Sequence, residues 1–312
     1  MPDADSAPDA GAGQQRGIWH TAAVNRSRIF LAGIAIGGTL GAGADPLYTT
    51  VTPATAQADP RISQALIDRQ PALIDSEVAR IGENSSPVAQ VYFLGFAGFG
   101  DERVFADEIA LAEERVAVRY DSGDRSLRLV NDHRDAEQHP LATVASLRYS
   151  LDALGRVMDA DDVLFLALSS HGSDDGTIVI SNPGMRSDSL SAAELTAALD
   201  HAGIRWRVIV ISACYAGSFI PTLADDHTIV VTAAAKDRTS FGCSDDRHLT
   251  YFGEGFYRDA LPAASTLRVA FEITQREIRR REKQEHVRPS HPQAWFGPLM
   301  ESRLDTLEKA AP

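Results

Sequence analysis

Apolar stretches of strand length alternate with amphipathic stretches of helical length from Val88 almost to the C-terminus. The short runs are rich in β-branched and aromatic residues, and they show no polar alternation. Strands covered on both faces have this composition, because neither face meets water. We therefore expect buried strands at residues 89–96, 126–131, 162–170, 206–212, 227–235 and 292–296.

Helical periodicity occupies the intervals between these runs. Ser191 and Glu194 form a capping box that predicts one further helix start, and Asn182-Pro183-Gly184 predicts the turn of a small hairpin. Strands that alternate with helices require crossover connections, so the fold class is α/β, with a mostly parallel sheet and helices on both faces. The expected longer helices lie at residues 102–115, 141–158, 251–261 and 265–284.

The N-terminal region differs from the rest in composition. Residues 1–60 predict a disordered region, and inside it Arg26 and Arg28 precede an uncharged Gly/Ala-rich segment at residues 29–44. A basic flank followed by an apolar segment is typical of an export signal, and the segment is short for a membrane span. We expect a periplasmic, secreted or membrane-anchored protein, with a cytoplasmic location as the alternative if this segment is only a flexible tail. Residues 61–87 predict a linker with short helices.

The net charge and the cysteine content of the chain exclude several classes of binding partner and cofactor. A net charge of −13 in 312 residues argues against a nucleic-acid partner and against an anionic membrane surface, so membrane association is expected only through residues 29–44. Two cysteines cannot form a disulfide framework in a chain of this length. The motif "GFAGFG" at residues 95–100 lacks the spacing of a dinucleotide fingerprint, and no cysteines or histidines have zinc-site spacing. We expect no metal and no organic cofactor.

Two expected strands end in reactive side chains. "LSSHGS" places His171 and Gly172 after the strand at 162–170, and "VIVISACYAGS" places Cys214 after the strand at 206–212. In a parallel sheet both residues emerge at the same edge, where His171 is able to take the thiol proton and return it to a leaving amine. The N–H groups of Gly172 and Cys214 then suit an oxyanion hole. On these residues alone, a buried structural cysteine and an ordinary loop histidine remain open alternatives.

The chain resembles the legumain-like cysteine peptidases of family C13, as a short, bacterial-type member. The resemblance runs from Val88 to Phe296 and rests on four blocks in order: "LGFAGFGDERVFADE", "LSSHGS", "ISACYAGSF" and "TAAAKDRTSFGCSDDRHLTYFGEGFY". It implies a caspase-like three-layer sandwich, with residues 88–312 as the peptidase domain. It also implies a cysteine endopeptidase that cleaves peptide or protein substrates through a thioester.

The resemblance also implies roles for single residues. Cys214 is expected as the nucleophile, His171 as the base and Gly172 as part of the oxyanion hole. Asp101 matches the family position that orients the catalytic histidine, and Val104 replaces a histidine of the family.

A specificity pocket for Asn, or for Asp, is the second implication. Arg103 matches its arginine, which donates to the carboxamide oxygen, Ser240 matches its serine, and Glu254 matches its acidic residue, which accepts from the carboxamide NH₂. Ser212 stands where the asparaginyl members carry Glu. Cys243 matches a further family cysteine, which we interpret as a buried structural thiol.

Two other functions stay open at this point. A transpeptidase or ligase of the same fold passes the acyl group to an amine rather than to water, and the sequence does not separate the two outcomes. A non-catalytic caspase-like module would bind peptides only, which the joint presence of Cys214, His171 and Gly172 disfavours. Activation by removal of residues 1–87 is a further hypothesis. The sequence predicts no oligomeric state.

Overall fold

The computed structural model describes residues 63–82, 88–132, 134, 139–244 and 246–310. All of them belong to one compact unit, Thr55–Pro312. The expected disordered region, with its signal-like segment at residues 29–44, lies outside the described residues. Within the described ranges, no helix combines the length and the apolar character that crossing a membrane requires.

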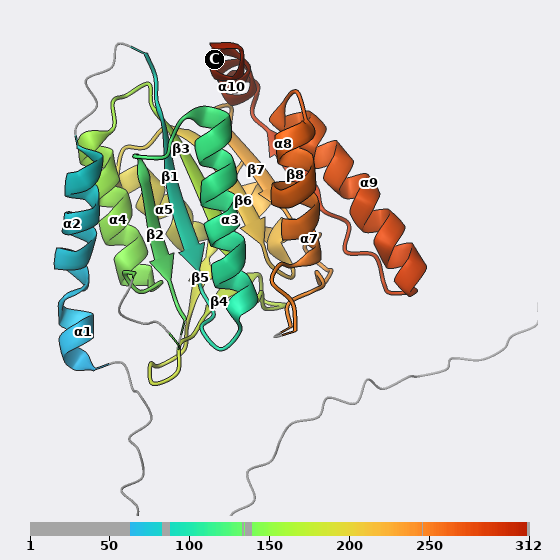
Figure 1. Cartoon of the computed structure of the whole chain (residues 1–312), viewed down its shortest axis with the longest axis horizontal. Helices are drawn as coiled ribbons and strands as arrows, with labels where there is room; N and C mark the ends of the chain where they lie inside the picture. The colour runs from blue at the N-terminus through green and yellow to red at the C-terminus, as the bar shows by residue number, and fades with distance from the viewer. Residues whose placement is uncertain (1–62, 83–87, 133, 135–138, 245, 311–312) are drawn as a thin grey trace, which may run out of the picture. The chain divides into compact units, whose positions relative to one another are not determined.

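A six-stranded sheet forms the centre of this unit, in the order β2-β1-β3-β6-β7-β8 (Figure 1). The first five strands in this order run parallel, and β8 pairs with β7 in the antiparallel direction. Every residue of β1 and β3 is buried, as their unbroken apolar runs predict. The predicted, mostly parallel sheet is confirmed. Its strands are β1 (Val91–Ala97), β2 (Ser126–Val130), β3 (Val163–Ser169), β6 (Trp206–Ser212), β7 (Thr228–Thr232) and β8 (Gln293–Phe296).

Alternate residues of each strand enter two separate cores. In β3, Val163 and Phe165 face one side of the sheet while Leu164 and Leu166 face the other, because successive side chains of a strand point to opposite faces. Helices cover both sides, which makes a three-layer sandwich (Figure 1). One layer holds α3 (Arg103–Tyr120), α9 (Leu267–Glu285) and α10 (Pro298–Ala310), and the other holds α2 (Gln70–Ile81), α4 (Val144–Val157), α5 (Ala192–His201) and α6 (Ile220–Leu223).

The segment expected as a linker contains two helices, α1 (Gln64–Asp68) and α2. Ile74 and Val78 of α2 are buried in the second core, and the side-chain oxygen of Gln70 accepts the backbone N–H of Leu141 at 2.6 Å. The short helices were predicted, but α2 packs on the sandwich and does not behave as a linker.

The predicted helix at residues 251–261 is divided into three pieces. A short turn, α7 (Tyr251–Gly253), leads into a π-helix, η2 (Glu254–Ala260), and α8 (Leu261–Ala263) follows. The wider turn of a π-helix changes the direction in which its side chains point, which the sequence pattern did not reveal. The predicted hairpin is present as β4 (Thr177–Ile180) and β5 (Asp188–Ser191), and a 3₁₀ turn, η1 (Ala216–Phe219), precedes α6.

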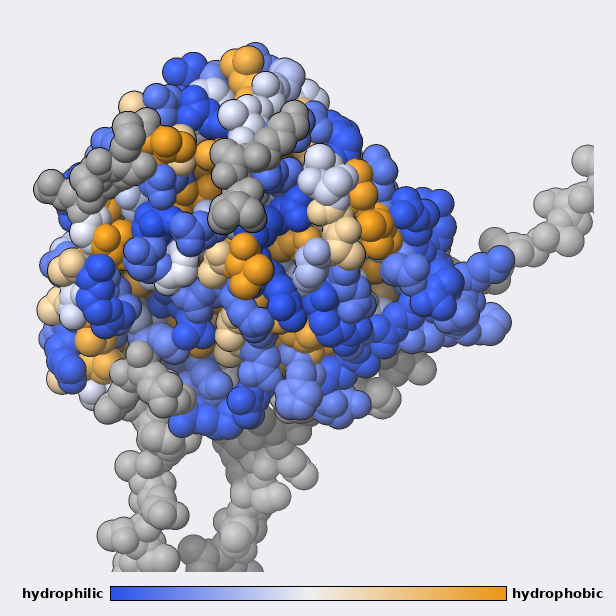
Figure 2. Space-filling model, turned by 45° about the horizontal axis from the view of Figure 1, so that its top comes forward, coloured by the Kyte–Doolittle hydropathy of each residue, from blue (hydrophilic) through white to orange (hydrophobic). Residues whose placement is uncertain are grey.

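The surface seen in Figure 2 is mainly hydrophilic, with small, separate apolar areas. Val118 on α3 is the most exposed large apolar residue in the described ranges, at 79%. Val210 in the central strand β6, by contrast, is fully buried.

This contrast gives a matched test of the layered core. Val210→Ala removes two methyl groups from the packed interior and should lower the free energy of unfolding by about 2–3 kcal/mol. Val118→Ala makes the same chemical change in water and should be neutral or slightly stabilising, because Ala favours the helix. Urea denaturation of both variants measures the difference. Equal effects would contradict the described packing.

Candidate active site

The pairing of β3 with β6 brings the two reactive residues to one edge of the sheet. Ser169, the last residue of β3, pairs with Ser212, the last residue of β6. His171 and Cys214 each follow two positions later. A Cβ atom at Gly172 would overlap the carbonyl oxygen of Cys214, so only glycine allows this approach. The His-Gly turn therefore lies directly against the backbone of Cys214.

Two backbone donors are available at this contact. The hydrogen bonds that flank Gly172 in its hairpin do not use its N–H, and within the described ranges no acceptor lies on the N–H of Cys214 either. Tyr215 has a left-handed φ of 58°, and its N–H donates to the carbonyl oxygen of Arg238 at 2.7 Å. Among the described residues, neither the N–H of Gly172 nor that of Cys214 has a backbone acceptor, which an oxyanion hole would require.

The imidazole of His171 is held on several sides. It packs edge-on against Phe99 and Phe105, with ring centroids 4.6 and 5.0 Å away. Its Nε2 lies 3.1 Å from Oε2 of Glu102, a buried oxygen that has no other polar partner among the described residues. The Glu102 carboxylate is therefore within ion-pair distance of Nε2, although this contact does not have hydrogen-bond geometry.

Glu102, and not Asp101, is the carboxylate beside the histidine. Asp101 was expected in this role, but it is exposed. Glu102 is the N-cap of α3 and has extended backbone angles (φ −120°, ψ 121°), so neighbouring side chains point in opposite directions here. The sequence shows two consecutive acidic residues and does not tell which of them turns inward.

Ser240, expected in the specificity pocket, lies beside the thiol of Cys214. Its backbone N–H donates to Sγ at 3.3 Å, and its hydroxyl oxygen lies 3.6 Å from Sγ. Both cysteines are free. Burial, helped by the nearby Cys214, raises the pKa of Cys243 to about 11, which makes Cys243 a weakly reactive thiol.

Glu254 does not join Ser240 in a pocket. Its carboxylate pairs with Arg247 at 2.7 Å, with Arg258 at 3.3 Å, and with Arg281. It lines a pocket of about 550 Å³ between η2 and α9 whose lining includes neither Ser240 nor Arg103. Glu254 opens the π-helix and faces α9, so its expected role as a free acceptor in the specificity pocket is not supported by the geometry.

Arg103 and Ser212 are the other two residues that were expected in the specificity pocket. Arg103, the first residue of α3, follows Glu102 directly; its side chain is 56% exposed, and its Nε donates to Asp107 at 2.9 Å. Ser212 is buried, with its hydroxyl oxygen 3.2 Å from that of Thr250, so it does not line an open pocket. Arg103 is accessible to a substrate side chain and Ser212 is not.

A fully buried carboxyl group, Glu108 of α3, was missed by sequence reasoning. It accepts hydrogen bonds from the hydroxyl of Ser169 and from both the backbone N–H and the hydroxyl of Thr250. A signal was present, because Glu108 interrupts the apolar stripe that Val104 and Ala112 define at helical spacing. A charged residue is expected at a core position of this kind only where hydrogen-bond donors or opposite charges surround it.

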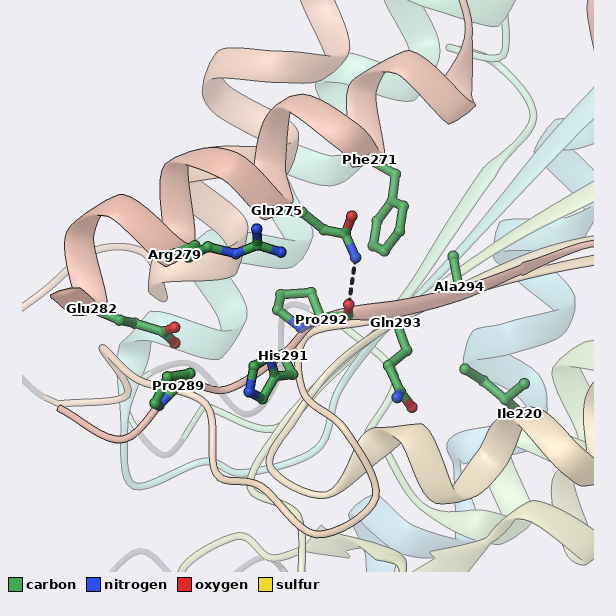
Figure 3. Close-up of a pocket in the computed structure, with 10 residues that line it drawn as sticks. All are labelled: Ile220, Phe271, Gln275, Arg279, Glu282, Pro289, His291, Pro292, Gln293 and Ala294. Atoms are coloured by element: carbon green, nitrogen blue, oxygen red, sulfur yellow. Dashed lines mark hydrogen bonds between the residues drawn. The ribbon is translucent and has the colours of Figure 1, made fainter.

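A second hollow lies at the same edge of the sheet, between α9 and the segment that leads into β8 (Figure 3). It measures about 600 Å³, and the side-chain amide of Gln275 crosses it to donate to the carbonyl oxygen of Pro292 at 2.7 Å. Gln293 packs against Gly217, three residues after Cys214. Among the described residues no group of His, Cys, Asp or Glu is placed to hold a metal ion.

Comparison with protein families agrees with this geometry. The model of the peptidase C13 family matches residues 146–302, half of the chain. The chain belongs to the peptidase C13 family. The six-stranded, mostly parallel sheet between two helical layers is the caspase-like sandwich expected for it. Membership supports a cysteine peptidase that acts on peptide or protein substrates. A search of the curated proteins found no match.

The family match covers only part of the site of this C13 peptidase. His171, Cys214 and Ser240 lie inside residues 146–302, whereas Glu102 and Glu108 precede that range. The assignment of Glu102 to His171 therefore rests on the structure alone.

Neighbouring acidic residues provide the test of that assignment. Glu102→Gln should lower kcat roughly 10–100-fold with little change in KM, because the imidazole loses the carboxylate that fixes it and stabilises its charged form. Asp101→Asn, one residue away and exposed, should retain wild-type kcat. Steady-state cleavage of a peptide substrate compares the two. A larger loss in the Asp101 variant would return the role to Asp101.

Proposed function

We propose that this C13 protein is a cysteine endopeptidase in which Cys214 is the nucleophile and His171 is the general base. The observation that carries this proposal is the contact between Gly172 and the backbone of Cys214. This contact supports the proposal because it puts the residue after His171 against the backbone of Cys214, and acyl transfer requires a thiol, an imidazole and N–H donors close together.

The proposed reaction uses these groups in sequence. His171 takes the proton of the Cys214 thiol, and the thiolate attacks the substrate carbonyl carbon. The N–H groups of Gly172 and Cys214 stabilise the oxyanion of the tetrahedral intermediate. His171, whose positive charge Glu102 stabilises, then protonates the leaving amine. Water hydrolyses the resulting thioester and releases the acid product.

An amine can take the place of water in the last step, which makes the chain a transpeptidase or ligase. The same thioester serves both outcomes, and no observation in the described residues favours transfer. A purely peptide-binding module does not account for a thiol, a base and an oxyanion site at one sheet edge.

For the residue before the scissile bond, we propose a preference for Asp over Asn. Recognition of a carboxamide needs a donor for its oxygen and an acceptor for its NH₂ group. Glu254, the expected acceptor, is neutralised by three arginines. Arg103 remains exposed next to Glu102, and a guanidinium binds a carboxylate in a bidentate manner.

The two cysteines give a matched test of the nucleophile. Cys214→Ser should abolish cleavage of a peptide library, because the alcohol is a much weaker nucleophile than the thiolate. Cys243→Ser should keep wild-type activity, since Cys243 takes no part in the proposed reaction. Mass spectrometry of the products, with and without an added amine, also separates hydrolysis from transfer. Cleavage that survives the first change would refute the proposal.

The substrate preference has its own test. Peptides that differ only in Asp or Asn before the scissile bond should show at least a tenfold higher kcat/KM for Asp, and Arg103→Gln should remove this difference. Arg280→Gln is the control, because Arg280 is an exposed helical arginine that likewise pairs with an acidic neighbour, Glu277. An unchanged Asp/Asn ratio in the Arg103 variant would exclude Arg103 from the pocket.

A further inference from the structure

Glu108 connects three segments that are distant in the sequence. Its carboxyl group, on α3, accepts a hydrogen bond of 3.1 Å from the hydroxyl of Ser169, which lies at the end of β3. It also accepts hydrogen bonds from the backbone N–H of Thr250 at 3.1 Å and from the Thr250 hydroxyl at 2.6 Å. Thr250 lies in the segment that follows Ser240. The hydroxyl of Ser212, at the end of β6, lies 3.2 Å from that of Thr250, so β6 is connected to Glu108 through Thr250.

These partners are next to the proposed catalytic residues. Ser169 precedes His171 by two residues, and Ser212 precedes Cys214 by two residues, in strands that pair at this point. The Glu108 carboxyl group therefore joins the end of β3 directly and the end of β6 through the Thr250 hydroxyl. Since a misplacement of about 1 Å between reacting groups costs about a hundredfold in rate, the position of these strand ends matters for the chemistry.

The carboxyl group is closely enclosed. A Cβ atom at Gly253 would overlap it, and the N–H of Gly253 donates to the Thr250 hydroxyl at 2.9 Å. No described cation forms an ion pair with Glu108, so its polar contacts are hydrogen bonds. Burial raises its pKa, and the bonds from Ser212, Thr250 and Ser169 offset part of that effect. A buried acidic group without a cation is costly unless its hydrogen bonds are complete.

We propose that Glu108 is a positioning residue of the peptidase site: it fixes the ends of β3 and β6 and the Thr250 turn relative to one another, and so sets His171 against Cys214. It touches neither the substrate nor the reacting atoms. This inference rests on the proposed function, because it concerns the same two catalytic residues.

The hydrogen-bond pattern distinguishes two variants. In Glu108→Gln, the amide oxygen is able to accept from Thr250 while the amide NH₂ donates to the Ser169 hydroxyl, which serves equally as donor or acceptor. The amide also avoids the cost of ionising a buried group. A buried carboxyl with a raised pKa lowers the stability of the fold as pH rises from the ordinary carboxyl range through its own pKa. Glu108→Ala leaves the Thr250 and Ser169 donors without a partner.

Glu282→Ala is a matched control for general destabilisation. Glu282 of α9 is also buried and also accepts a backbone N–H, that of Ser290, at 2.9 Å. It lines the hollow of Figure 3, and its side chain makes no hydrogen bond to Ser169, Ser212 or Thr250 in the part of the chain that the structure describes. Urea denaturation of the full-length variants shows how far each change weakens the fold.

Two readouts on the folded variants test the proposal. The first is kcat and KM for a peptide with Asp before the scissile bond. The second is the rate at which iodoacetamide alkylates Cys214 at pH 6, measured on the peptide that contains it; at this pH a thiol without a base reacts slowly. We expect Glu108→Ala to lower kcat about a hundredfold with little change in KM and to slow alkylation to the rate of glutathione. Glu108→Gln should stay within threefold of wild type, and Glu282→Ala should retain both rates.

Other results would overturn the proposal. It is wrong if Glu108→Ala keeps the wild-type kcat and alkylation rate, if Glu108→Gln fails to restore them, or if Glu282→Ala loses both rates in parallel with stability. Alkylation does not require peptide cleavage, so it tests the positioning role of Glu108 independently of the proposed endopeptidase function. A wild-type protein that cleaves no peptide, but whose Cys214 reactivity depends on Glu108, would refute the endopeptidase function and support the positioning role.

Discussion

The parallel pairing of β3 with β6 is the constraint on which the site depends. It aligns Ser169 with Ser212, and both strands end there, so the next residues of each must leave the sheet at the same edge. The two cores hold this pair in place, because each strand is buried on both faces. Gly172 then allows the two turns to touch. The residues that we propose as nucleophile, base and oxyanion donors thus all lie at this backbone contact.

Acidic groups complete this arrangement from α3 and the residue that caps it. Glu102 faces His171 directly, while Glu108, almost two turns further along, lies beneath the strand ends. The first is able to stabilise a positive charge on the imidazole, and the second supplies acceptors for hydroxyl and N–H donors that burial would otherwise leave unpaired. Helix α3 is therefore part of the site although it lies before the region that the family model matches.

Hydrophobic periodicity was sufficient to predict the sheet, because buried strands and amphipathic helices leave distinct patterns. It also placed His171, Gly172 and Cys214 at strand ends, whereas Ser240 was expected only from the family resemblance, as a residue of the specificity pocket. It failed where function depends on which way a side chain turns. For Asp101 and Glu102, the backbone angles before α3 decide which of the two carboxylates faces His171. Glu254 lies in a π-helix, where it pairs with Arg247, Arg258 and Arg281. Contacts between distant segments decide such cases, and a local pattern does not contain them.

In the proposed reaction, Cys214 forms the covalent intermediate. Rapid-quench incubation with a peptide substrate, followed by acid denaturation and mass spectrometry, detects a thioester on the protein directly. We expect an added mass equal to the N-terminal product on the peptide that contains Cys214, and a much weaker signal when His171 is replaced by Ala. Peptide cleavage with no adduct on Cys214, or with the adduct on another residue, would contradict it.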